Sequence, residues 1–141
     1  MKEQFCLVDH EGAFLWMDPV EGATQVSIPD SVERWEAIWK FRKETVVIAH
    51  SHPVGPSDFS HTDRTTMDAL VLALAPEVLF FAVVSPIGTR FISHRALTRK
   101  FDPWSGSLLP LVEGSVMLPR GLEPGWAKWL RQASMQEEKE I

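Results

Sequence analysis

The stretch "HSHPVGPSDFSHTD", residues 50–63, is the part of this chain on which the interpretation of the rest depends. It follows "TVVIA" (45–49), a β-branched apolar run that predicts a buried central strand. A helical pattern comes after it, from about His61 to Ala75. The sequence therefore predicts a strand that ends in two histidines, then a turn, then a helix entered through a serine and an aspartate.

The side chains of this stretch suit a metal ion. His50 and His52 are two residues apart, so at a strand end both imidazoles point to the same side. Ser60 occupies a natural helix N-cap position, and Asp63 falls in the first helical turn, which can bring its carboxylate back toward the histidines. Two imidazole nitrogens and one carboxylate oxygen make three ligands and leave a fourth position open. An open position is typical of catalytic rather than structural zinc.

Each half of the pattern also has a structural explanation. Strand ends often carry surface histidines, and Ser60 with Asp63 alone indicates a capping box of the helix. The two halves occur together here, with a proline and a glycine between them that turn the chain. The combination favours a metal site, and the capping role is compatible with it.

At these residues the chain resembles the JAMM (MPN+) zinc metalloproteases, which include isopeptidases that remove ubiquitin from conjugates. The shared pattern is His50, one residue, His52, seven residues, Ser60, two residues, Asp63. The order of strand, motif, helix and strand between residues 45 and 84 also matches. The resemblance implies an α/β (α+β) fold with a mixed central sheet flanked by helices, the cytidine-deaminase-like JAMM/MPN fold. It also implies Zn²⁺ held by His50, His52 and Asp63 together with a water, and Ser60 helping to stabilise the oxyanion.

A water on zinc needs a base to accept its proton, and in the family this base is a glutamate on an early strand. Glu3 begins the strand-like run "EQFCLVD" (3–9), with the small Cys6 three residues on. If that strand is antiparallel to residues 45–49, Glu3 lies beside His50. We therefore predict Glu3 as the base, and a frayed terminal glutamate is the alternative.

Other glutamates are less well placed. Glu44 is at the opposite end of the strand that leads to the histidines, roughly 20 Å away along extended chain. Glu33 and Glu36 fall on a solvated face of a predicted helix, and Glu11 falls in a hairpin turn. If Glu3 is not the base, we expect Glu11, Glu36 or a residue of another chain to take its place.

The resemblance also implies a substrate. In the family, the extended tail of a ubiquitin-like protein pairs with an exposed strand edge beside the site. Short bacterial members occur beside activating-enzyme-like, conjugating-enzyme-like and ubiquitin-like proteins, so we expect a ubiquitin-like protein or its conjugate as the partner. The alternatives are a peptidase acting on a sulfur-carrier protein or a cell-wall peptide, a metal-free or inactive MPN-type scaffold, and a relative associated with DNA repair.

The composition sets the remaining expectations. At 141 residues the chain fits one domain, 1–141, in which we assign 101–141 to a C-terminal extension ending in a helix. The net charge of -5 provides no basic surface for nucleic acid. A single cysteine indicates a reducing compartment, and we find neither a signal-peptide pattern nor a membrane-length apolar run. We expect a cytoplasmic protein with no membrane partner.

The rest of the chain supplies the elements around the central stretch. We predict a hairpin (3–17), a short strand (24–28), a helix (29–43), two strands (78–84 and 89–94) and a terminal helix (126–140). The first of these helices carries an apolar stripe that we expect to pack on the sheet. The members of the stripe are Val32, Trp35, Ile38 and Trp39. We expect His10 and His94 at the surface.

Overall fold

The computed structural model describes residues 2–18, 31–54, 58–97, 101–102, 107–108 and 115–135. Its strands are β1 (Phe5–Val8), β2 (Phe14–Met17), β3 (Val47–Ser51), β4 (Phe80–Ser85), β5 (Gly88–Ser93), β6 (Phe101–Asp102), β7 (Ser107–Leu108) and β8 (Ser115–Pro119). Its helices are α1 (Val32–Lys40), α2 (His61–Leu74), α3 (His94–Leu97), the 3₁₀ turn η1 (Arg120–Leu122) and α4 (Gly125–Met135). Within these ranges, no helix combines the length and the apolar character needed to cross a bilayer.

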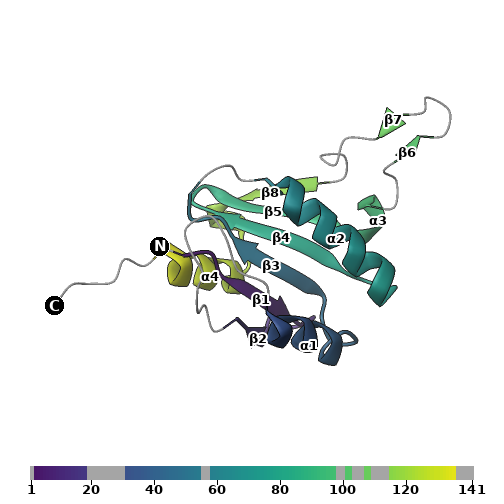
Figure 1. Ribbon diagram of the computed structural model, residues 1–141. Coiled ribbons are helices and arrows are strands. Elements are labelled where there is room, and N and C mark those ends of the chain that lie inside the picture. The colour runs from purple at the N-terminus through teal and green to yellow at the C-terminus, as the bar shows by residue number, and fades with distance from the viewer. Residues whose placement is uncertain are drawn as a thin grey trace.

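Six strands form one mixed sheet in the order β2-β1-β3-β4-β5-β8 (Figure 1). β3 and β4 are parallel, with α2 as the crossover between them, whereas all other neighbouring strands are antiparallel. β3 is central, because β1 pairs with one side of it and β4 with the other. Because β3 and β4 are parallel, their carboxyl ends lie next to each other at the same end of the sheet. β6 and β7 pair with each other, apart from this sheet.

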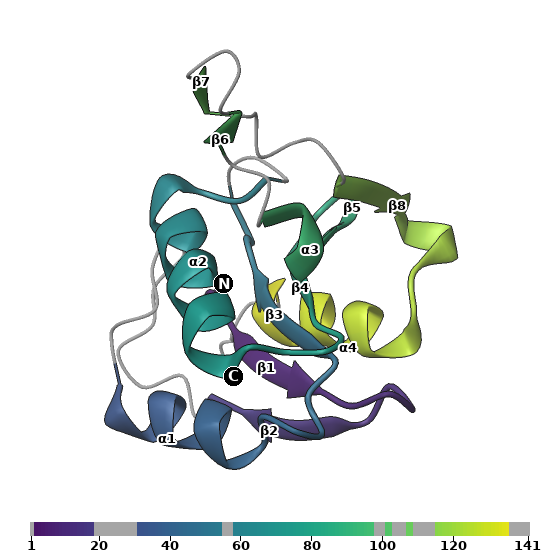
Figure 2. The ribbon, with the colours of Figure 1, turned by 90° about the vertical axis from the view of Figure 1, so that its right-hand side faces the viewer.

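The sheet is buried between two helical layers. Figure 2 shows α1 and α2 against one face and α4 against the other. Successive residues of a strand point to opposite faces, so each strand serves both layers. Ile48 of β3 packs with Ala37 of α1 and Met67 of α2 in the first core. Ala49, the next residue, packs with Leu130 of α4 in the second. A parallel strand pair with apolar side chains on both faces needs a helix on each of them.

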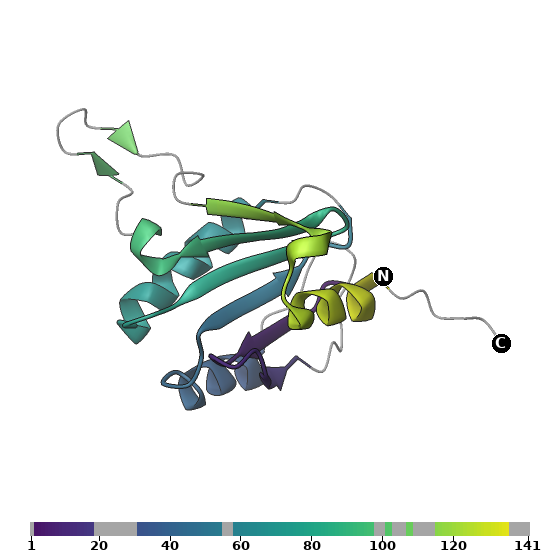
Figure 3. The same ribbon diagram turned by 180° about the vertical axis from the view of Figure 1, so that it is seen from behind.

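A buried ion pair attaches α4 to the sheet. Figure 3 shows the sheet from the side that α4 covers. The Arg131 guanidinium donates to both carboxylate oxygens of Glu123 and, over 2.7 Å, to the carbonyl oxygen of Ser85. The Thr89 hydroxyl also donates to Glu123. Burying two charges is costly unless each is paired and hydrogen-bonded. Here both conditions are met, so the pair holds α4 against the β4–β5 hairpin.

The predicted fold class is confirmed. The hairpin at the start of the chain, the central strand, the helix after it, the next two strands and the terminal helix are all present. The strand predicted at 24–28 lies outside the described residues. Part of the segment assigned to a C-terminal extension supplies β8 of the main sheet and α4 of the second core. The division of 1–141 into a domain and an extension stays a prediction.

The prediction of a buried apolar stripe on α1 was right for Ile38 and wrong for its other members, Val32, Trp35 and Trp39. Val32 is exposed, and Trp39 is 56% exposed with the Arg42 guanidinium 4.0 Å from its ring centre. The buried face of the helix instead consists of Arg34, Ala37 and Ile38. An ion pair explains the rotation, because Arg34 lies 3.8 Å from the buried Asp18 carboxylate. The sequence pattern placed both tryptophans in the core, and the contact between Arg34 and Asp18 turns them toward the surface instead.

Gly88 gives a test of the close packing between β5 and β8. A Cβ atom at this position would clash with the carbonyl oxygen of Leu118 and lie 2.9 Å from Met117 Cε. We expect Gly88→Ala to lower the free energy of unfolding by about 1–3 kcal/mol, as overpacking does elsewhere. Urea denaturation measures this change. Gly125→Ala is the matched control, because nothing described lies within 4 Å of its Cβ. An equal loss in both variants would contradict the packing explanation.

Candidate metal centre

The two histidines of the central stretch lie at the carboxyl end of β3. His50 pairs with Phe5 of β1 and with Val83 of β4 in the sheet register. His52 follows the strand, and its backbone N–H donates to the carbonyl oxygen of Val84 at 2.7 Å. Both backbone positions are thus fixed by neighbouring strands. By strand alternation both side chains face the side of the sheet that carries α2.

A capping box brings the aspartate to the same place. Ser60 is the N-cap of α2, and its hydroxyl accepts from the Asp63 N–H at 3.1 Å. In return the Ser60 N–H donates to Asp63 Oδ2 at 2.8 Å. These two bonds satisfy N–H groups that the first helical turn leaves without helical partners. They also hold the Asp63 carboxylate in one orientation at the helix start.

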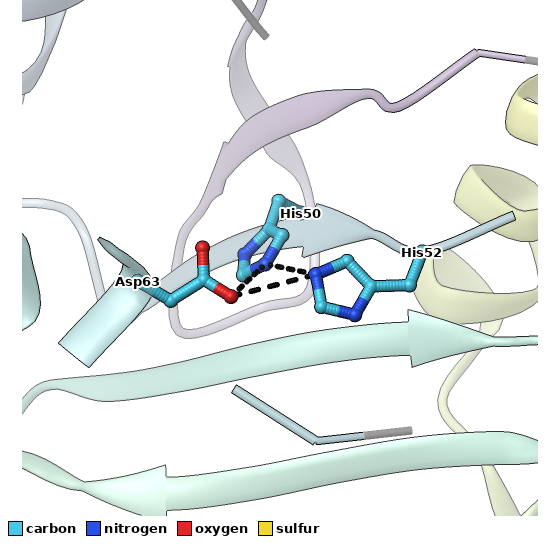
Figure 4. Close-up of side chains that lie close together, drawn as sticks. All are labelled: His50, His52 and Asp63. Atoms are coloured by element: carbon cyan, nitrogen blue, oxygen red, sulfur yellow. Dashed lines mark hydrogen bonds and ion pairs between the residues drawn. The ribbon is translucent and has the colours of Figure 1, made fainter. Parts of the chain in front are cut away.

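The three predicted ligand atoms form a small triangle (Figure 4). His50 Nε2 lies 3.0 Å from His52 Nε2 and 3.1 Å from Asp63 Oδ2. The third side, from His52 Nε2 to Asp63 Oδ2, measures 3.4 Å. These residues are the one group in the described part of the chain whose ligand atoms converge in this way. The sequence therefore located a real cluster, and ligation by its members stays a prediction.

The triangle has the size that a tetrahedral zinc ion requires. Ligand atoms bonded to zinc at 2.0–2.1 Å in a tetrahedron lie roughly 3.3 Å from one another. All three sides of the observed triangle are close to that value, and the donors are two nitrogens and one oxygen. His50, His52 and Asp63 therefore fit zinc both by distance and by ligand chemistry.

The charge balance of the cluster favours an ionised aspartate. Burial by itself raises the pKa of Asp63, but hydrogen bonds with His50 and His52 and the bond from the Ser60 N–H outweigh it. The net result is a pKa well below the usual range of an aspartate. A metal ligand must be deprotonated, so this carboxylate is ready to bind a cation at any ordinary pH.

Glu3 lies beside the triangle without belonging to it. β1 is antiparallel to β3 and pairs Phe5 with His50, which places the residues before Phe5 next to the end of β3. Glu3 Oε1 is 3.9 Å from His52 Nε2, and the Glu3 side chain is 12% exposed. Burial raises the pKa of Glu3, and the charges of the two histidines partly oppose this. A raised pKa moves a carboxylate toward the range in which it can both take and release a proton near neutrality.

The competing glutamates lie elsewhere. Glu11 is in the β1–β2 turn and Glu44 precedes β3, both at the end of the sheet opposite the histidines. Glu33 and Glu36 are exposed on α1. Among the glutamates weighed from the sequence, Glu3 alone is placed to act on the cluster.

The other histidines take no part in the cluster. His10 is exposed, as predicted, and His61 is exposed at the start of α2. The prediction for His94 was wrong, because this residue is buried at the start of α3. The Leu79 N–H donates to its Nδ1 at 3.1 Å, and the His94 N–H donates to the Leu79 carbonyl oxygen. Leu79 precedes β4, so His94 stabilises the end of the sheet far from the triangle.

Sequence reasoning missed a charged residue near the cluster. Arg90 of β5 pairs with Val83 of β4, which pairs with His50, so Arg90 and His50 lie in one row across the sheet. Its guanidinium is 3.9 Å from Asp58, which lies just before α2 and is also 3.9 Å from Arg64. This bridge ties the start of α2 to β5. The sequence alone does not link Arg90 with Asp58, because the register of β5 against β4 brings the two side chains together.

This arrangement defines a class of protein. A mixed sheet whose central strand ends in a His-x-His pair, followed by a crossover helix that returns an aspartate, is the JAB/MPN type of domain. A family model described as prokaryotic homologs of the JAB domain matches residues 6–98, more than half of the chain. The chain belongs to this family, which confirms the resemblance seen in the motif. No curated protein matches the chain. Family and cluster together support either a metal-dependent peptidase or an MPN-type scaffold.

Metal content tests the ligand assignment. We expect protein purified without chelator to contain close to one divalent metal ion per chain, measured by elemental analysis. His52→Ala should lose most of that metal, since two ligands hold zinc far less well than three. His10→Ala is the control, as an exposed histidine outside the cluster. Full metal retention by a His50→Ala, His52→Ala double variant would refute the assignment.

Proposed function

We propose that this chain is a zinc-dependent isopeptidase or peptidase that cleaves after the C-terminal tail of a ubiquitin-like protein, either to release it from a conjugate or to process its precursor. The observation that carries the proposal is the pairing of a complete ligand triangle with a separate, half-buried carboxylate. A scaffold needs neither Glu3 beside His52 nor three ligand atoms within 3.0–3.4 Å of one another.

Each residue of the site has one task. His50, His52 and Asp63 would hold Zn²⁺, which when bound supplies a Lewis acid and lowers the pKa of its water to about 7. Glu3 accepts a proton as the water oxygen bonds to the scissile carbonyl carbon. Glu3 then gives that proton to the leaving amine as the carbon–nitrogen bond breaks. Water is consumed, and a carboxylic acid and an amine are released, so atoms and charge balance.

Ser60 is proposed to stabilise the oxyanion. Its hydroxyl accepts a bond from the Asp63 N–H, and a hydroxyl that accepts one bond can still donate another. Ser60 is exposed at the start of α2, on the same side as the ligands. A donated bond aimed at the substrate carbonyl oxygen would strengthen as negative charge develops there.

The way a substrate tail would bind is constrained by the sheet. Within the described residues, β3 has a partner strand on each side, so no edge runs directly beside His50. The edges of the sheet are β2, two places from β3, and β8, three places away. Neighbouring strands are about 4.8 Å apart, so a tail paired with the outer side of β2 would be three spacings, or roughly 14 Å, from β3. Pairing of the tail with a strand edge stays a prediction, with β2 the nearer candidate.

Cleavage of defined substrates tests the function. The first probe is a linear fusion in which a peptide bond joins the tail of a ubiquitin-like protein to a reporter. A sulfur-carrier protein with one added C-terminal amino acid and a cell-wall stem peptide serve as the other two. We expect cleavage of the fusion that chelator abolishes and added zinc restores. Cleavage of another probe alone would move the activity to that substrate class. No cleavage of any probe by metal-loaded protein would favour the scaffold.

Glu3→Gln is the sharpest test of the proposed mechanism. The amide keeps the shape of the side chain but has no basicity, and Glu3 is not a ligand, so the metal should stay bound. General acid–base catalysis contributes about a hundred- to ten-thousand-fold, so turnover should fall by at least about two orders of magnitude. The measurement is kcat together with metal content. Glu11→Gln, at the exposed opposite end of the same hairpin, is the matched control. Unchanged kcat in Glu3→Gln would rule out Glu3 as the base.

A further inference from the structure

Two buried serines connect the metal end of β3 to α4. Ser51, which lies between the two histidines in the sequence, is 0% exposed, and Ser134 of α4 is 1% exposed. The Ser51 hydroxyl donates to the Ser134 hydroxyl oxygen at 2.6 Å. The Ser134 hydroxyl in turn donates to the Lys2 carbonyl oxygen at 2.6 Å. A chain of short bonds therefore runs from β3 through α4 to the start of the protein.

The same two serines bind both neighbours of Glu3. On one side, the Gln4 N–H donates to Ser51 Oγ at 2.8 Å, and the Ser51 N–H donates to the Gln4 carbonyl oxygen at 2.9 Å. On the other side, the Lys2 N–H donates to the Ser134 carbonyl oxygen at 2.9 Å. That carbonyl belongs to the last turn of α4, where the helix leaves acceptors without helical partners. Both peptide units that flank Glu3 are thus held in place.

Strand alternation explains how α4 can act on a site that it does not touch. Ser51 points to the face of the sheet that carries α4, whereas His50 and His52 on either side of it point to the α2 face. Residues at a chain terminus are usually poorly ordered unless something holds them. Here the serines hold the backbone at Lys2 and Gln4, and the side chain of Glu3 projects from between them toward His52.

We propose that Ser134 is a positioning residue: through Ser51 and the Lys2 carbonyl it holds Glu3 beside His52, where the carboxylate can take the proton of the attacking water. The inference rests on the proposed function, because the position of Glu3 matters for the rate only if Glu3 transfers the proton from the water to the leaving amine. Glu3 and Ser134 both lie outside residues 6–98, the span that the family model matches. The base and the residue that positions it are therefore supplied by the two ends of the described chain.

The test is a double-mutant cycle between Ser134→Ala and Glu3→Gln, with kcat and KM measured on the ubiquitin-like fusion. A displacement of about 1 Å in a catalytic group can cost about a hundredfold in rate. We expect Ser134→Ala to lower kcat by roughly ten- to a hundredfold, with little change in KM and full metal content. In the Glu3→Gln background, measured by single turnover, the same substitution should cost nothing further. A merely structural role would lower the rate equally in both backgrounds.

A readout independent of activity completes the test. Hydrogen exchange of the Gln4 amide, followed by NMR, should speed up at least about tenfold in Ser134→Ala. Thr45→Val is the matched control, because it removes a buried hydroxyl that donates to the Phe41 carbonyl oxygen at the other end of β3. It should leave kcat and Gln4 exchange unchanged. Ser134→Thr, which keeps the hydroxyl, should restore most of kcat.

The experiment distinguishes failure of the positioning role of Ser134 from failure of the proposed function. An active wild type with unchanged kcat in folded Ser134→Ala, or with equal losses in both backgrounds, overturns the positioning role and leaves the proposed function in place. Unchanged Gln4 exchange overturns it as well. A metal-loaded wild type that cleaves no probe removes the proposed function, and the positioning role with it. If Ser134→Ala does not fold, Ser134→Gly and Ser51→Ala, which also remove a hydroxyl of this chain of bonds, replace it. A cycle in which they show no coupling to Glu3 then overturns the positioning role.

Discussion

The position of one oxygen atom, Asp63 Oδ2, is the constraint on which the rest of the structure depends. It accepts the Ser60 N–H that begins α2, and it lies within 3.4 Å of the ligand nitrogens of both histidines. A helix that began one residue earlier or later would turn Asp63 by about 100° and remove it from the histidines. The start of α2 is therefore fixed by the end of β3. α2 then leads into β4, which pairs parallel with β3 at the centre of the sheet.

The central stretch could be predicted from the sequence because its information is local. The spacing of His50, His52, Ser60 and Asp63 encodes a strand end, a helix cap and a ligand set within one short segment. Glu3 was within reach of the same reasoning, since antiparallel pairing of an early strand with the central one decides its place. What the sequence could not reveal depends on contacts between distant residues. The Arg34–Asp18 pair rotates α1, and Leu79 draws His94 inside.

The two faces of the sheet have different tasks. The α2 face carries the ligands and Glu3, and its chemistry is visible in the sequence because histidine and aspartate are chemically distinctive. The α4 face carries Ser51, Ser134 and the Arg131–Glu123 pair, which are ordinary residues until their contacts are known. Polar groups as deeply buried as these two serines require partners, and their partners are the backbone on either side of Glu3. The hydrogen bonds that satisfy the buried serines on the α4 face therefore also fix the backbone that presents Glu3 on the α2 face.

The contact between Lys2 and Ser134 also joins residues that are synthesised far apart in time. A ribosome makes Glu3 before every described strand and Ser134 only after all of them. β1, β3 and α2 can assemble the three ligand residues while α4 has yet to be made. Glu3, however, has nothing to fasten its backbone at Lys2 until the last turn of α4 emerges. Under the proposed function, a nascent chain would thus complete its three predicted metal ligands before its base, and activity would begin only once α4 has been made.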